Sequence, residues 1–387
     1  MEPSSKPYVF IAFGLVAALF GTVAVIDVIV DPYFIFGSAT INTFTPYKET
    51  LPEITAKAEL ARKLEYDTLY LGTSRTEVGM DPLSPFHGGR SCYNAGVPAC
   101  KPDEATGMFR IAMEHNDVER VYLIIDFMMI RAGERNSYDY LISRANPELG
   151  LAEYYLLGLF GYRSIDDSIK TLENWLEDDV IMQPERAVRG HYPMDREVAR
   201  ASARALFNKS YVQYLTPGRG YYATHRYSSD TLQFIEAMAG ECAARGAMLY
   251  LMVPPLHAVM YEGMREFGIW KDFEQLKRDA AQIAAIGDHV EGWDFSGYTA
   301  YTTEPAPETE NDPPLQWHYE PAHFRPALGD LMLQQIRGLP LNDPPGERLT
   351  AENVERRIQA MRAAREAWAA ANEPEIARVR AVARGKE

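Results

Sequence analysis

The chain has 387 residues, of which 47% are hydrophobic and 24% are charged. This balance is typical of a globular protein of one or two domains and excludes a largely disordered chain. The formal net charge of −15 argues against binding of a nucleic-acid backbone as the main role, so no nucleic-acid partner is expected.

An uncharged apolar run at residues 8–26 dominates the N-terminus. As a helix it would be about 28 Å long, which matches the hydrocarbon core of a bilayer. We therefore expect a membrane anchor at residues 1–30, with a core helix of a soluble domain as the alternative. Lys6 precedes the run, whereas Asp27 and Asp31 follow it. The positive-inside rule then places the N-terminus in the cytoplasm and the rest outside, as a single-pass protein.

Short apolar runs separated by amphipathic helical patterns predict a parallel α/β sheet within a domain at 31–340. The predicted strands lie at 67–71, 90–97, 121–127, 247–253 and 290–295. Residues 131–225 are rich in Tyr, Arg, Asp and Glu, and they predict a helical insertion that shapes a substrate pocket. Residues 341–387 predict a linker followed by a charged helix. That helix is either a frayed surface helix or a partner-binding tail.

The first predicted strand ends in Gly72-Thr73-Ser74, at the carboxyl edge where α/β sheets bind ligands. Gly72 permits a tight bend of the backbone there. Ser74 either presents its hydroxyl to a pocket or caps the following helix, and this stretch alone leaves both open.

A serine nucleophile needs a base, usually a histidine oriented by an acid. His323 follows Glu320 by three residues, so the carboxylate can hold the ring. His257 ends a buried strand at the same predicted edge as Ser74, although a lone histidine is more often structural. After the second strand, Asn94-Ala95-Gly96 is either a source of oxyanion donors or a plain turn.

The three cysteines have no C-x-x-C spacing and no accompanying histidine cluster, so neither a metal site nor another cofactor is expected. Cys92 and Cys100 are close enough in sequence to be bridged in an oxidising compartment. Two buried thiols are the equally consistent alternative.

The order of these motifs resembles the SGNH (GDSL-like) hydrolase superfamily. It is most similar to the membrane-anchored bacterial branch that includes relatives of alginate O-acetyltransferases and of the D-alanyl-transfer protein of teichoic acid. The resemblance covers about residues 27–336 and rests on Asp31-Pro32-Tyr33, Leu71-Gly72-Thr73-Ser74-Arg75 and Glu320-Pro321-Ala322-His323-Phe324. It implies a three-layer, flavodoxin-like parallel sheet.

The resemblance makes Ser74 the nucleophile, His323 the general base and Glu320 its orienting acid. It assigns Gly96, with Asn94, to the oxyanion hole. The residues expected near the pocket are Arg75, Asp126 and His257. The chain departs from the family pattern in three places: Glu320 stands where Asp is usual, Thr73 replaces the Asp of a strict GDS motif, and Asp126-Phe127-Met128 replaces the Gly-x-Asn-Asp block.

These features predict an acyl esterase or O-acyltransferase of the bacterial inner membrane that faces the periplasm. Its expected substrates are acyl esters, most directly O-acetyl groups of an exported or cell-wall polysaccharide, and the family implies an integral-membrane acyl-transfer partner. The main alternative is a catalytically degenerate glycan-binding or assembly protein. Its sugar-stacking residues would be Tyr154, Tyr155, Tyr211, Tyr214, Tyr221 and Tyr222. A membrane-tethered scaffold that acts through the C-terminal helix is a third hypothesis.

Overall fold

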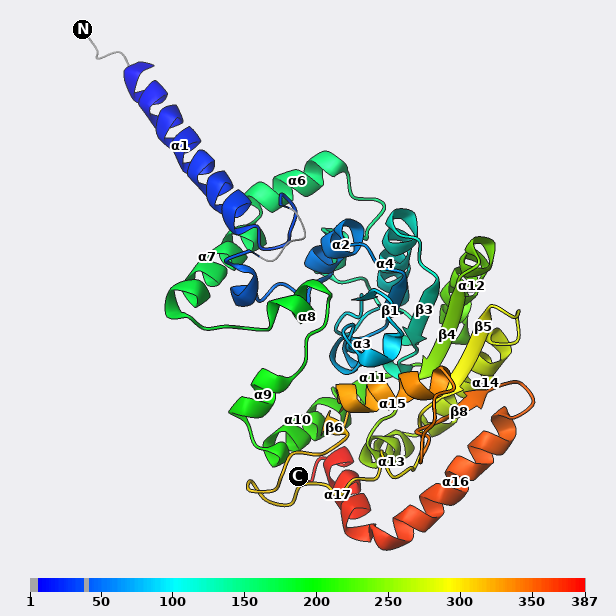
Figure 1. Ribbon diagram of the computed structural model, residues 1–387. Coiled ribbons are helices and arrows are strands. Elements are labelled where there is room, and N and C mark those ends of the chain that lie inside the picture. The colour runs from blue at the N-terminus through cyan, green and yellow to red at the C-terminus, as the bar shows by residue number, and fades with distance from the viewer. Residues whose placement is uncertain (1–5, 38–41, 387) are drawn as a thin grey trace.

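A mostly parallel six-stranded sheet forms the centre of the protein (Figure 1). The structure is a computed structural model that describes residues 6–37 and 42–386. The strand order is β2-β1-β3-β4-β5-β8, in which β8 alone runs antiparallel to its neighbour. The strands are β1 (Thr68–Leu71), β2 (Cys92–Asn94), β3 (Arg120–Ile124), β4 (Met248–Val253), β5 (Val290–Asp294) and β8 (Glu347–Leu349). The predicted mixed α/β architecture with a parallel sheet is confirmed.

The strands alternate their side chains between two apolar cores. Leu69 and Leu71 of β1 belong to the larger core, whereas Tyr70 belongs to the smaller one on the opposite face. The helices that contribute to the larger core include α2 (Ile54–Lys63), α4 (Pro102–His115), α12 (Gln233–Arg245), α13 (Ala258–Glu266) and α14 (Trp270–Ile283). The smaller core lies under α15 (Pro326–Ile336). Both faces of the sheet are therefore covered, which explains why the strand sequences are continuous apolar runs.

The chain between β3 and β4 is largely helical, as the composition of residues 131–225 predicts. Its helices are α5 (Tyr138–Leu141), α6 (Leu151–Phe160), α7 (Tyr162–Glu177), α8 (Pro184–Val188), α9 (Asp195–Arg200), α10 (Ala203–Leu215) and α11 (Tyr221–Thr224). Short 3-10 helices lie at η1 (Thr45–Tyr47), η2 (Pro85–His87), η3 (Phe127–Met129) and η4 (Ser229–Leu232).

The N-terminal helix α1 (Lys6–Val30) projects away from the body (Figure 1). Its apolar part, Tyr8–Val30, is long enough to cross a membrane, and none of its most apolar stretch is buried. The alternative of a core helix is therefore wrong, and α1 fits either a membrane anchor or a signal sequence. Residues 1–5 of the predicted anchor lie outside the described residues. Within the described ranges, no other helix is long and apolar enough to span.

The C-terminal segment is part of the folded body rather than a frayed surface helix. After β8 has joined the sheet, α16 (Val354–Ala371) packs on α14, and α17 (Glu373–Ala383) packs on α13 and α10. Ile358 and Val379 are fully buried. The prediction failed because the charges on these helices suggested solvent on all sides, whereas many of them pair with residues of the body.

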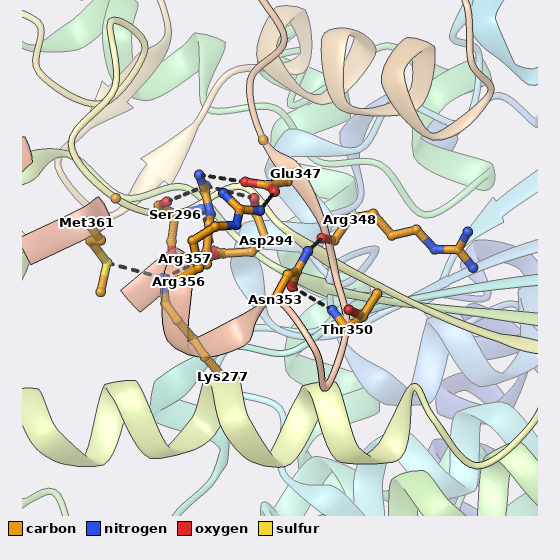
Figure 2. Close-up of polar contacts among 12 residues, drawn as sticks. Lys277, Asp294, Ser296, Glu347, Arg348, Thr350, Asn353, Arg356, Arg357 and Met361 are labelled. Carbon is orange, nitrogen blue, oxygen red and sulfur yellow. Dashed lines mark hydrogen bonds and ion pairs between the residues drawn. The ribbon is translucent and has the colours of Figure 1, made fainter. Parts of the chain in front are cut away.

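A buried ion cluster fastens this segment to the sheet (Figure 2). Asp294, the last residue of β5, accepts from Lys277 Nζ at 2.9 Å and from Arg357 Nε of α16 at 3.1 Å. Burial by itself would raise the pKa of Asp294, but the two cations hold that pKa below its ordinary value. The Asp294 carboxylate is therefore charged at neutral pH and compensates a fully buried lysine.

We predict that Asp294→Ala lowers the free energy of unfolding by about 3–5 kcal/mol, because it leaves the buried Lys277 ammonium without its carboxylate. Urea unfolding of the full chain in detergent micelles measures the change. Glu355→Ala is the matched control, because it breaks an exposed pair of α16 with Arg278 and should change the free energy of unfolding far less. Equal losses in the two variants would contradict the role of the cluster.

Candidate active site

Ser74 lies at the first position of α3 (Ser74–Gly79), directly after β1. The turn requires Gly72, whose φ is +142° and where an added Cβ would lie 2.7 Å from the carbonyl oxygen of Ile124. Thr73 is the N-cap, because its Oγ1 accepts from the N–H of Arg75 at 3.4 Å. The alternative in which Ser74 caps the helix is therefore wrong, and its hydroxyl is available for another partner.

Glu320 and His323 lie on a two-stranded hairpin made of β6 (His318–Glu320) and β7 (His323–Phe324). The two residues are paired across the hairpin. Cross-strand neighbours of this kind have side chains close enough to interact. The three-residue spacing therefore brings carboxylate and imidazole together through a hairpin.

A chain of hydrogen bonds joins Ser74, His323 and Glu320. The Nε2 atom of His323 lies 2.8 Å from Ser74 Oγ, and its Nδ1 is hydrogen-bonded to Glu320 Oε1. A carboxylate only accepts, so Nδ1 carries the proton and Nε2 is left to accept from the serine. This is the arrangement by which a histidine removes a proton from a serine nucleophile.

Glu320 is held in its charged form by one donor from α10 and one from the turn of its own hairpin. Ser210 Oγ of α10 and the N–H of Ala322, at 2.9 Å, both donate to Glu320 Oε2. Burial raises the pKa of this carboxyl, but His323, Ser210 and Ala322 together hold it below the ordinary value. Although glutamate stands in place of the usual aspartate, Glu320 Oε1 is hydrogen-bonded to the imidazole of His323.

Ser74 and His323 line a cavity of about 360 Å³. Its walls come from the ends of β1 and β3, from the loop before α4, and from α10 and α11. The other lining residues are Thr73, Pro98, Ala99, Cys100, Lys101, Asp126, Met128, Met129, Arg131, Glu134, Gln213, Tyr214 and Tyr221. The helical insertion thus contributes to the wall, and the cavity has room for a small acyl group and part of an acceptor.

Arg75 does not line the cavity but links its walls. The buried guanidinium pairs with Asp126, donates to the carbonyl oxygen of Ala322 at 2.8 Å, and donates to Tyr214 Oη at 3.1 Å. Asp126 also accepts from Thr73 Oγ1 at 2.7 Å. Through Arg75, the serine turn is therefore tied to the residue that precedes His323.

Asn94 and Gly96 do not face the cavity. The Asn94 amide donates to the carbonyl oxygens of Thr76 at 2.8 Å and Met80 at 2.7 Å, and its Oδ1 accepts from the Gly96 N–H at 2.9 Å. Their donors are therefore occupied, and the predicted oxyanion role of both residues is not supported. Asn94 instead holds α3 against the sheet.

His257 does not line the cavity, contrary to its predicted place in the pocket. Its buried ring caps α13 and bonds the carbonyl oxygen of Glu304 at 2.7 Å. Burial lowers its pKa to about 4, with a further contribution from His318. A neutral, fully enclosed histidine of this kind is structural.

Sequence reasoning missed Ser210, which donates to Glu320 from the insertion, and it considered Tyr214 only for sugar stacking, whereas Tyr214 accepts a hydrogen bond from Arg75. No local motif marks them, because their roles depend on how α10 packs. All three cysteines are buried free thiols, so Cys92 and Cys100 are not bridged. Among the described residues, no group of three or more His, Cys, Asp or Glu is arranged for a metal ion.

Comparison with known proteins gives little further guidance. No family model and no curated protein matches the sequence. Among solved structures, one described as "a putative platelet activating factor from Streptococcus pneumonia" is similar at 10% identity, over 74% of this chain and 89% of that chain, with a TM-score of 0.33. A likeness this distant carries no argument about activity.

We predict that Arg75→Met loosens the β6–β7 hairpin, because it removes the hydrogen bond to Ala322 and leaves Asp126 buried without its cation. Amide hydrogen exchange in residues 318–325 should become faster, and the free energy of unfolding should fall by about 3–5 kcal/mol. Arg131→Met is the control, since Arg131 lines the same cavity but pairs with the partly exposed Glu134. Unchanged exchange in the Arg75 variant would contradict the proposed link.

Proposed function

We propose that the chain is a serine-dependent acyl-transfer enzyme, an esterase or O-acyltransferase that acts on acyl esters. The observation that carries the proposal is the Ser74–His323–Glu320 hydrogen-bond chain on the wall of a cavity. Each member has the partner that its role requires, and the carboxylate is buried and charged.

In the proposed reaction, Ser74 Oγ attacks the acyl carbon of the ester while His323 Nε2 takes its proton. The tetrahedral intermediate collapses as the C–O bond to the leaving alcohol breaks, and His323 returns the proton to that oxygen. Water or a sugar hydroxyl then attacks the acyl-serine by the same proton transfers. Exclusion of water at this stage decides between hydrolysis and transfer.

The negative charge on the intermediate needs donors close to Ser74. The backbone N–H of Ser74 is one, because the first N–H groups of a helix have no intrahelical acceptor. We assign the oxyanion-donor role to this N–H in place of Gly96 and Asn94.

The strand order supports placement among SGNH-like enzymes. Strands β2-β1-β3-β4-β5 run parallel in the order of a flavodoxin-like doubly wound sheet. Ser74 follows β1, at the carboxyl edge where such sheets bind ligands. The antiparallel β8 is an addition at the far edge.

We infer that the enzyme is anchored by α1 in the bacterial inner membrane, with its body in the periplasm and an exported or cell-wall polysaccharide as acyl donor or acceptor. The charge difference between Lys6 and the acidic residues after the run supports this orientation. An integral-membrane partner that delivers acyl groups would fit a site held near the bilayer. Tyr221 in the cavity wall is exposed enough to stack on a sugar ring.

The glycan-binding alternative has less support. Tyr154, Tyr211, Tyr214 and Tyr222 are buried, which leaves Tyr155 and Tyr221 as the more exposed members of the tyrosine set. A binding protein also has no need for an aligned base and a charged, buried orienting acid.

The direct test is turnover of p-nitrophenyl acetate by the full chain in detergent micelles. We expect Ser74→Ala and His323→Ala to lower the rate by a factor on the order of 10⁴ or to background, because each removes a member of a unit. Ser229→Ala and His115→Gln, which change residues outside the cavity, should retain the rate. Equal activity in all five proteins would refute the acyl-serine mechanism.

A further prediction concerns the pH dependence of kcat/KM. Ser210→Ala removes a donor to the charged Glu320, so the pKa of the Glu320 carboxyl rises and the acid limb of kcat/KM moves to higher pH. Activity at the acid end should fall about tenfold, while the plateau changes little. Ser210→Thr keeps the hydroxyl and should restore the profile. A loss that is the same at every pH would mean that Ser210 contributes only to packing.

A further inference from the structure

Helices α6 and α7 leave a group of large apolar side chains uncovered. We call it the α6–α7 apolar surface, and it consists of Leu151, Tyr155, Leu156, Phe160, Tyr162, Ile169 and Leu176. Leu156 is 58% exposed and Tyr162 is 82% exposed. The two helices contact each other, and large apolar side chains exposed on neighbouring helices indicate a site of interaction.

On α6, the inward side is packed and the outward side is apolar. Tyr154 is buried, and Gly158 lies so close to Ile35 that an added Cβ would be 2.8 Å from its Cδ1. The helix carries a single charged residue, Glu153 in its first turn. α6 is therefore fixed to the segment that follows α1, with nonpolar residues facing outward.

On α7, the side chains divide into three sectors. The sequence places Tyr162, Ile165, Ile169, Leu172 and Leu176 on one apolar stripe. A second sector is small, polar and buried: Ser164, Ser168 and Thr171. The third sector carries the charges Arg163, Asp166, Asp167, Lys170, Glu173 and Glu177. An exposed apolar stripe beside a charged one is the pattern of a helix that lies in a membrane interface.

Both helices contact α1, near which they lie in Figure 1. Ser168 Oγ of α7 donates to Asp27 Oδ1 at 2.5 Å. At the end of α6, the ring of Phe160 packs edge-on against Phe20, with centroids 5.5 Å apart. The α6–α7 apolar surface is therefore continuous with the exposed apolar surface of α1.

The position of Phe20 gives the depth of this contact. At 1.5 Å per residue, Phe20 lies about 18 Å from the Tyr8 end of the span and about 15 Å from the Val30 end. A hydrocarbon core is about 30 Å thick. If α1 crosses a bilayer, Phe20 lies inside its hydrocarbon core, and the Phe160 ring that touches it must lie there too.

We infer that the α6–α7 apolar surface is a second membrane-binding element, embedded in the leaflet on the side of the body. The inference rests on the part of the proposed function that makes α1 a membrane anchor, and it is independent of the acyl chemistry. The charged sector of α7 is mainly acidic, so burial of apolar surface drives the insertion rather than attraction to anionic lipids. With two elements in the bilayer, the body cannot pivot freely about α1.

Depth-dependent quenching tests this arrangement. The full chain carries Leu156→Cys labelled with an environment-sensitive NBD dye, in phosphatidylcholine vesicles whose acyl chains bear a nitroxide quencher. Leu15→Cys in α1 is the positive control, and Ile286→Cys, equally exposed beyond α14, is the negative control. The unsubstituted chain measures any labelling of the buried native cysteines. Tyr162→Cys provides a second position on the surface.

We expect the dye at Leu156 and Tyr162 to be quenched and blue-shifted like that at Leu15, and the dye at Ile286 to be unaffected. If Leu15 is quenched while Leu156 and Tyr162 behave like Ile286, the inference is overturned although the anchor stands. If Leu15 is also unquenched, both the anchor and this inference are overturned. Neither result bears on turnover by Ser74.

Discussion

The buried ion pair between Arg75 and Asp126 is the interaction on which the candidate site depends. It joins the turn after β1 to the end of β3, and through Ala322 it reaches the hairpin that carries His323. A buried pair of this kind adds little net stability, because desolvation of both charges offsets their attraction. Its value lies in geometry: five donors in a fixed plane let one arginine hold three segments that are far apart in sequence.

Helix α10 transmits the packing of the C-terminal segment to the same site. On one side it contacts α17, where Tyr211 donates to Glu375 and Arg378 donates to Asn208. On the other side it supplies Ser210 to the orienting acid and Tyr214 to Arg75. The C-terminal helices therefore support Glu320 indirectly, through their contacts with α10.

Local patterns predicted the sheet, the position of Ser74 at its edge and the pairing of Glu320 with His323, because each rests on short-range chemistry. The partnership of Ser74 with His323, which are 249 residues apart, came from the family resemblance instead. A buried strand that ends in Gly72 forces the next residues to the ligand edge, and three-residue spacing brings Glu320 to the ring. Asn94 and the C-terminal helices were misjudged because the partners that decide their roles lie elsewhere in the sequence. An asparagine in a turn looks the same whether its amide faces a ligand or, as here, the end of a helix.

The insertion between β3 and β4 contacts both the N-terminal helix α1 and the candidate site. Its first part, α6 and α7, contacts α1. Its later part, α10 and α11, forms a wall of the cavity and hydrogen-bonds Glu320. Because both parts belong to one connected segment packed on the same body, the direction of the cavity relative to α1 is fixed by packing rather than by a flexible linker. Under the proposed function, an acyl group supplied at the membrane would therefore meet a site of defined orientation, which is what efficient transfer between two fixed partners requires.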